Sequence, residues 1–141
     1  MSASTKQLAE RWFQEVWNER CDEALLELTA GDATAYLESE THVHGISAFK
    51  EFRDNMVNAL PDLNVKVEDM ICDGNQVVTR WFLIGTHTGD GFGLKPTYRA
   101  IRFRGISWFR FRGNKLHEGW DSWNQGRVFN LMSEQYVEKE E

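Results

Sequence analysis

The sequence predicts an α+β fold in which helices cover one face of a curved, mostly antiparallel sheet. Three segments with helical spacing of apolar residues precede Pro61, whereas alternating patterns typical of strands dominate from Leu63 onward. The strand-forming part also carries turn signals at Asp73-Gly-Asn75 and Gly113-Asn114. Helices first and an antiparallel meander afterwards indicate an α+β domain. A bent sheet closed by helices forms a cone, and a ligand would lie inside it.

Each expected helix combines an apolar stripe with a polar residue able to cap its free backbone N–H groups. In the first helix Leu8, Trp12 and Val16 recur at a spacing of four. The expected caps and ranges are Ser4 or Thr5 for a helix to about Asn18, Asp22 for Glu23–Thr29, and Ser47 for Ala48–Leu60.

Five runs are expected to form strands, with loops rich in polar residues and glycine between them. The expected strands are Ala33–Leu37, Leu63–Cys72, Gln76–His87, Tyr98–Arg112 and Lys115–Asn124. We expect Glu38–His44 and the glycine-rich Thr88–Gly93 to be loops, and Arg127–Met132 to form one helical turn. A single domain is expected over residues 1–141, with residues 133–141 a frayed acidic tail.

Composition limits the possible partners. The net charge of −6 disfavours nucleic acid, which basic proteins bind through phosphates. No apolar run approaches the length of a membrane span. Cys21 and Cys72 lack metal-ligand spacing, and the first residues lack the apolar core of a signal peptide, so we expect free thiols in the cytoplasm. The aromatic content of 13% suits a packed core or the wall of a pocket.

The candidate catalytic residue is Asp121, which lies between Trp120 and Trp123 in the last expected strand. A carboxylate in apolar surroundings has a raised pKa, which suits an acid or base. Its neighbours depend on the strand register. A two-residue turn places Ile106 opposite Asp121, whereas a bulge near Gly105 places Ser107 there.

Other polar residues have bland and functional interpretations. His87 lies at the end of an expected strand, where it is either a structural residue or a second acid-base group. Arg80 is the one charge in a core-like strand and either reaches an edge or pairs with a carboxylate such as Asp121. His42 and His44 have chelating spacing but no supporting ligand, so no metal site is predicted. The alternate arginines of Tyr98–Arg112 indicate a solvated or subunit-facing surface.

Several motifs together resemble the SnoaL-like polyketide cyclase (ester cyclase) family of the nuclear transport factor 2-like superfamily. They are Arg11-Trp-Phe-Gln-Glu-Val-Trp-Asn18, Pro61-Asp-Leu-Asn-Val-Lys-Val-Glu68, Arg80-Trp-Phe-Leu-Ile-Gly-Thr-His-Thr-Gly89, Gly93-Leu-Lys-Pro-Thr97, Gly105-Ile-Ser-Trp-Phe-Arg110 and Glu118-Gly-Trp-Asp121. The resemblance covers about Gln7 to Met132.

The resemblance implies a cone-shaped α+β barrel that dimerises through its sheet and uses no cofactor or metal. It implies that Asp121 takes a proton alpha to a carbonyl of a polyketide ester and returns one to the new alkoxide. Ser107 stands where the cyclases carry a pocket histidine. Arg80 is followed two residues on by Phe82, so the Asp-Arg-Asp set of the related epoxide hydrolases is incomplete.

The sequence is compatible with three functions. The first is an acid-base enzyme of the cyclase, isomerase or hydratase kind that acts on a hydrophobic carbonyl compound. Its catalytic groups would be Asp121 and His87, and its expected substrate-binding residues are Trp17, Arg80, Trp81, Phe92, Ser107, Trp108 and Trp120. The second is a non-catalytic module that binds a small apolar ligand in the same pocket. The third is a structural dimer whose cone is filled by its own side chains.

Overall fold

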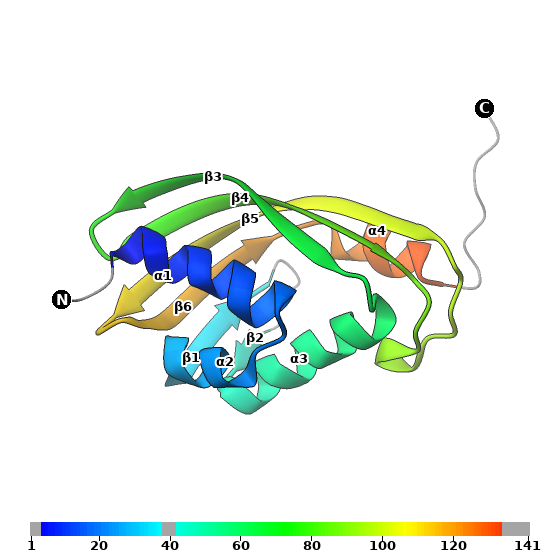
Figure 1. Ribbon diagram of the computed structural model, residues 1–141, viewed down its shortest axis with the longest axis horizontal. Helices are drawn as coiled ribbons and strands as arrows, with labels where there is room; N and C mark the ends of the chain where they lie inside the picture. The colour runs from blue at the N-terminus through cyan, green and yellow to red at the C-terminus, as the bar shows by residue number, and fades with distance from the viewer. Residues whose placement is uncertain (1–3, 38–41, 134–141) are drawn as a thin grey trace.

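A six-stranded curved sheet and the helices on its concave side form the α+β fold that the sequence predicts (Figure 1). The computed structural model describes residues 4–37 and 42–133. The strand order is β2-β1-β6-β5-β4-β3. The strands are β1 (Thr29–Tyr36), β2 (His42–His44), β3 (Asn64–Asp73), β4 (Gln76–Thr86), β5 (Ala100–Arg112) and β6 (Lys115–Ser122).

The three segments before Pro61 form helices, as their apolar spacing predicts, whereas a 3₁₀ turn lies in the segment Thr88–Gly93 that was expected to be a loop. The helices are α1 (Thr5–Arg11), the π-helix η1 (Trp12–Asn18) that continues it, α2 (Asp22–Leu28), α3 (Ile46–Ala59), the 3₁₀ turn η2 (Gly91–Gly93) and α4 (Gln125–Leu131). In Figure 1 the long strands arch over α1 and α3. No helix in the described part of the chain is long and apolar enough to cross a membrane.

The first helix is capped by Ser4, whose side chain accepts a hydrogen bond from the Gln7 N–H. The other two predicted caps are wrong. Cys21 caps α2 by accepting from the Ala24 N–H, because α2 begins one residue earlier than predicted. Gly45, at φ 85°, precedes α3, and Ser47 lies inside the helix. The positive φ at this corner favours glycine, because glycine has no Cβ atom.

The predicted meander is confirmed for β3 to β6, whose neighbours pair antiparallel. The first strand differs, because β1 pairs with β6 in parallel and with the short β2 in antiparallel fashion. The segment expected as a loop from Glu38 therefore contains β2, and residues 38–41 lie outside the described part. Most of the predicted acidic tail, residues 134–141, also lies outside it.

The two faces of the sheet are chemically distinct. Along β5 the odd-numbered residues Ile101 to Phe111 are buried, whereas Arg102, Arg104, Ile106 and Trp108 on the other face are exposed. This alternation follows from the two-residue period of a strand, and it confirms that the arginines lie on the outer surface. The inner face and the helices together enclose the core.

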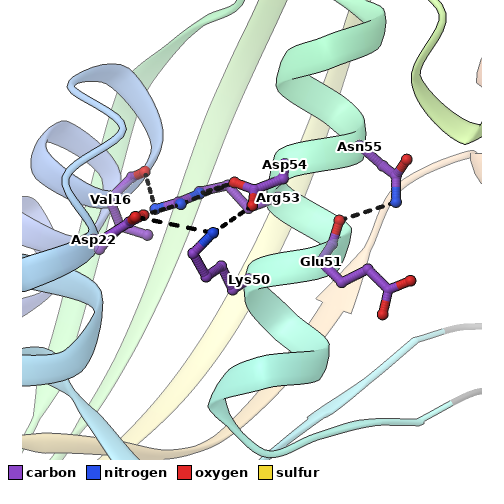
Figure 2. A network of polar contacts seen from close by, with 7 residues as sticks. All are labelled: Val16, Asp22, Lys50, Glu51, Arg53, Asp54 and Asn55. Carbon is purple, nitrogen blue, oxygen red and sulfur yellow. Dashed lines mark hydrogen bonds and ion pairs between the residues drawn. The ribbon is translucent and has the colours of Figure 1, made fainter.

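A buried arginine holds the helices in place around that core (Figure 2). Arg53 of α3 is 2% exposed and donates hydrogen bonds to Asp22 at the start of α2, to Asp54, and to the carbonyl of Val16 in η1. Lys50 Nζ lies 2.7 Å from Asp54 Oδ2. Because two carboxylates and a carbonyl surround the guanidinium, its charge is compensated where it is buried. The network ties α3 to α2 and η1.

Candidate functional site

A pocket with apolar walls opens inside the cone. It holds about 900 Å³ of empty space, including the solvent at its mouth. Because this space reaches Asp121, the pocket argues against a purely structural cone filled by its own tryptophans.

Aromatic side chains from the helices and the sheet form most of the wall. The lining side chains with aromatic rings are Trp12, Phe13, Trp17, Phe49, Phe52, Trp81, Phe103, Phe109 and Trp123. Several pack on one another, for example Trp12 on Phe49 with ring centroids 4.9 Å apart. Rings packed in this way present flat, rigid surfaces to a ligand.

The π-helix explains how both tryptophans of the first helix reach the pocket. Trp12 and Trp17 are five residues apart, and both line it. The hydrogen bonds of a π-helix join residues five apart, so such residues lie on one face. An uninterrupted α-helix aligns residues three and four apart instead. The sequence predicted the stripe but not this change of helix type.

Asp121 lies on the inner face because of a bulge in β6. The turn pairs Arg112 with Lys115, as predicted, but the register shifts by one residue between Phe111↔Leu116 and Arg110↔Glu118. The extra residue on β6 is His117. The shift places Ser107 opposite Asp121, whereas the unbulged register would have placed Ile106 there. The bulge thus faces Arg110 and Phe111 of β5, whereas it was expected near Gly105.

Ser107 and Trp81 form a hydrogen-bonded chain that ends at Asp121. The Ser107 hydroxyl donates to Asp121 Oδ1, and the Trp81 indole N–H donates to Ser107 Oγ at 2.9 Å. These three side chains come from β6, β5 and β4 and all line the pocket. Among the described residues, none donates a hydrogen bond to Asp121 Oδ2.

The Trp81 indole fits beside Ser107 because residue 105 is glycine. Gly105 is the cross-strand partner of Trp81. A Cβ atom at residue 105 would lie 2.2 Å from Trp81 Cζ2, far inside contact distance. The absent side chain therefore leaves the space that the indole occupies.

Burial raises the pKa of Asp121 to about 6, and the hydrogen bond from Ser107 opposes this shift by stabilising the carboxylate. Asp121 retains some accessible surface. It belongs to the lining of the pocket, where its surroundings are chiefly apolar. Among the described lining residues, Asp121 is the only one with a titratable side chain. The other polar side chains are the hydroxyls of Thr29, Thr34 and Ser107.

Four of the nine residues predicted for the site line the pocket: Trp17, Trp81, Ser107 and Asp121. Three others lie on the outer face. Arg80 is exposed, with Nε 3.9 Å from Glu68 Oε1, so of its two alternatives it reaches the surface and does not pair with Asp121. Trp108 is 47% exposed, and Trp120 packs on it and on Tyr36. Because side chains alternate along a strand, Arg80, Trp108 and Trp120 lie on the opposite face of the sheet from Ser107 and Asp121.

His87 and Phe92 lie outside the pocket lining. His87 is fully buried, and its Nδ1 accepts a hydrogen bond from the Thr97 N–H at 3.3 Å and lies 2.9 Å from Thr97 Oγ1. Burial and the nearby Arg99 lower the pKa of His87. Phe92 packs between Phe52 and Phe129. Through Thr97, His87 thus joins the two ends of the segment between β4 and β5 that contains the expected loop Thr88–Gly93.

Sequence reasoning missed several lining residues, including the small residues Ala33, Ala35 and Gly119. Ala33 and Ala35 lie on β1, whose parallel pairing with β6 has no local sequence signal. Phe49, Phe52 and Met56 also line the pocket, from α3. The described residues contain no group of three or more His, Cys, Asp or Glu side chains that could hold a metal.

Comparisons with known proteins give a family match and several structures of similar fold. The family model for SnoaL-like polyketide cyclases matches residues 7–130. No curated protein matches the chain. Among solved structures, a candidate SnoaL-like polyketide cyclase from Jannaschia sp. CCS1 is 20% identical, with a TM-score of 0.83 over 95% of this chain and 98% of that one.

Two further structures from Streptomyces are similar at 21% identity. IdmH from Streptomyces antibioticus, a candidate polyketide cyclase, has a TM-score of 0.80 over 92% of this chain and 99% of its own. AclR from Streptomyces galilaeus, a candidate hydroxylase, has a TM-score of 0.79 over 96% and 87%. The matched fold is the nuclear transport factor 2-like cone. Since the family model covers most of the sequence, this chain belongs to the SnoaL-like polyketide cyclase family.

Proposed function

We propose that the protein is a cofactor-independent enzyme that moves a proton on a hydrophobic carbonyl compound, with Asp121 as general acid and base. The observation that carries the proposal is the isolation of Asp121. It is the only titratable side chain among the described residues of an aromatic pocket, and its pKa is raised to about 6. A catalytic base works best when its pKa lies near the working pH.

One carboxylate would have to serve both as base and as acid. As carboxylate, Asp121 would take a proton from the carbon alpha to a carbonyl and become a neutral acid. In aldol closure, the resulting enolate carbon would attack a second carbonyl, and Asp121 would return its proton to the new alkoxide. In isomerisation, Asp121 would return the proton to a different carbon of the enolate. The protein ends in its starting state, as intramolecular aldol closure and isomerisation both require.

The wall of the pocket supports an uncharged, largely apolar substrate. Its described lining contains no Lys, Arg or His to compensate an anionic group. Burial of an uncompensated charge there would cost several kcal/mol, on the order of the penalty for ions in proteins. Polyketide-like esters, which are flat and carry several carbonyls, meet these requirements. Membership of the polyketide cyclase family supports the same class.

Exchange of the alpha hydrogen tests the proposal without knowledge of the product. The protein is incubated in D₂O with a panel of neutral aromatic ketones and esters, and deuterium at the alpha carbon is measured by mass spectrometry. We expect Asp121-dependent exchange of at least one compound, and a loss of about 10²-fold or more in Asp121→Asn. Exchange that is equally fast in Asp121→Asn contradicts the role of Asp121.

The second candidate is a non-catalytic module that binds a small apolar ligand in the same pocket. The observation that favours it is the wall itself, whose polar side chains other than Asp121 are three hydroxyls in the described lining. In that case Asp121→Asn would retain ligand affinity, and no panel compound would exchange hydrogen. Fluorescence quenching of the pocket tryptophans measures affinity independently of turnover, so the two functions can be distinguished.

The outer sheet face supports the expectation of a homodimer. Ile71, Ile84, Ile106 and Trp108 are each more than 40% exposed there. Arg104 lies over the Phe82 ring at 4.5 Å, which adds an amphipathic surface. We propose that a second copy covers this face, and sedimentation of Trp108→Glu beside the unaltered protein tests it.

Cys21 and Cys72 are free thiols, which supports a place in the reducing cytoplasm.

A further inference from the structure

We infer that Trp81 is a positioning residue, which acts through Ser107 to leave Oδ2 of Asp121 as the oxygen that exchanges protons with a ligand. This inference rests on the proposed function, in which Asp121 is the acid-base group. It concerns two side chains that need not touch the reacting atoms.

The direction of the hydrogen bonds follows from the donor groups involved. An indole N–H can only donate, so Ser107 Oγ accepts from Trp81 Nε1 at 2.9 Å. A carboxylate can only accept, so the single hydroxyl hydrogen of Ser107 lies toward Asp121 Oδ1. The chain therefore has one orientation, with Trp81 donating to Ser107 and Ser107 donating to Asp121.

This orientation makes the two carboxylate oxygens unequal. Oδ1 receives the Ser107 hydrogen, whereas none of the described residues donates to Oδ2. When Asp121 becomes neutral, a proton on Oδ1 would confront the Ser107 hydrogen. A proton on Oδ2 leaves the chain intact. Without Trp81 the hydroxyl of Ser107 would lose the partner that fixes its lone pairs, and both oxygens would become available.

The surrounding structure holds the chain rigidly. Trp81, Ser107 and Asp121 lie on three adjacent strands, and the absent side chain at Gly105 makes room for the indole. Trp81 also packs on Phe103 with ring centroids 5.8 Å apart. The described lining of the pocket brings no other titratable or charged group to Asp121. The hydroxyl is therefore the main polar influence on the carboxylate.

Donation by Trp81 also strengthens the bond from Ser107, because hydrogen bonds in a chain polarise one another. A stronger bond from Ser107 favours the carboxylate over the neutral acid. Removal of the indole N–H should thus raise the pKa of Asp121 through Ser107 alone. A tryptophan that only fills space would have no such dependence on Ser107.

The test is a titration of Asp121 by carbon-13 NMR of the labelled carboxyl group, with no ligand present. We expect Ser107→Ala to raise the midpoint by about one pKa unit, the worth of a hydrogen bond to a charged group. Trp81→Phe should raise it by about 0.3 units, the size expected for polarisation through one bond. In the Ser107→Ala background, Trp81→Phe should add nothing.

Controls separate the N–H from the loss of indole volume. Trp108→Phe removes an indole N–H that donates to Gln76 at the same 2.9 Å on the outer face, and it should not move the midpoint. If Trp81→Phe fails to fold, the benzothiophene analogue of tryptophan at residue 81 keeps the shape and removes only the N–H.

An unchanged midpoint in the Trp81 variants, or an equal shift with and without Ser107, overturns the inference. These outcomes are independent of the hydrogen-exchange test, because no substrate is used. If no compound exchanges hydrogen but Trp81→Phe shifts the midpoint only when Ser107 is present, the proposed reaction is rejected and the positioning role of Trp81 is kept.

Discussion

The hydroxyl of Ser107 donates a hydrogen bond to Asp121 from the directly opposite position of the β5–β6 ladder. This contact is the only polar one that the described residues make to a carboxylate otherwise dominated by desolvation. The contact depends on the bulge at His117, and its donor Ser107 is in turn held by Trp81, whose indole occupies the space beside Gly105.

Gly105→Ala should displace the Trp81 indole. The new Cβ would lie 2.2 Å from Cζ2 of a buried ring that packs on its neighbours. Overpacking of this kind costs about 1–3 kcal/mol in the free energy of unfolding. Denaturation by urea measures that loss. Gly31→Ala is the matched control, because no atom lies within 4 Å of the position of its Cβ, and it should be nearly neutral. Equal effects of the two substitutions would contradict the close packing.

Asp121→Asn should stabilise the protein at alkaline pH. The pKa of Asp121 in the folded protein, about 6, lies above the ordinary value of 3.8, so the folded state binds the proton more tightly than the unfolded state. Ionised Asp121 therefore destabilises the fold, increasingly as the pH rises from 3.8 to about 6, and constantly above that. We expect Asp121→Asn to be more stable by about 1–3 kcal/mol at pH 8.

The same comparison at pH 3.5 supplies the control for that substitution. Both forms then carry a neutral side chain at residue 121, and the difference in unfolding free energy should largely vanish. Calorimetric scans at the two pH values measure it. A stabilisation that is independent of pH would point to packing rather than to the charge of Asp121.

Arg53→Met should destabilise the fold by about 2–3 kcal/mol. The substitution keeps much of the buried volume but removes the hydrogen bonds to Asp22, Asp54 and the Val16 carbonyl (Figure 2). Hydrogen bonds to charged groups are each worth about 1.5–3 kcal/mol, and apolar packing offsets part of the loss. Thermal unfolding measures the result.

Lys50→Met is the comparison for Arg53→Met. Lys50 makes an ion pair with Asp54 at 2.7 Å, but its side chain is 44% exposed. Exposed pairs contribute about 0–1 kcal/mol. A Lys50→Met variant as unstable as Arg53→Met would show that burial is not what matters in this network.

Ala35→Trp should block the pocket while the fold is kept. Ala35 lines the pocket from β1, and the larger side chain would fill part of its empty space. The neutral dye Nile red, whose fluorescence rises in apolar surroundings, reports the occupancy of the pocket. We expect about tenfold weaker dye binding or more, as a loss of about 1.4 kcal/mol implies. Leu26→Trp, at a 59% exposed residue, should leave dye binding unchanged. Unchanged binding in Ala35→Trp would place the dye elsewhere.

Much of the fold could be predicted from periodicity alone. The apolar stripe of Leu8, Trp12 and Val16 identified the first helix, and the alternation along β5 identified which residues face the core. The parallel pairing of β1 with β6 could not be predicted, because partners far apart in the sequence leave no local pattern. The change to a π-helix at Trp12 also lacks a local signal.

The candidate site could be predicted only in part for a related reason. Asp121 was identified from its apolar neighbours in the sequence and from family resemblance, but its partner depended on the register. One extra residue at His117 reverses every side chain beyond it. Trp120, adjacent in sequence to Asp121, consequently lies on the outer face with Trp108. Arg80 alternates outward by the same rule, whereas Trp81 lies beside Ser107.

The most direct test of the account is the ionisation of Asp121 in the unaltered protein. Its carboxyl resonance, assigned by its absence in Asp121→Asn, is followed by carbon-13 NMR from pH 3 to pH 9. We predict a single transition with a midpoint near 6, as expected for a carboxyl group desolvated by the pocket. A midpoint near the ordinary value of 3.8 would contradict the account, because Asp121 would then be a solvated carboxylate and a weak base.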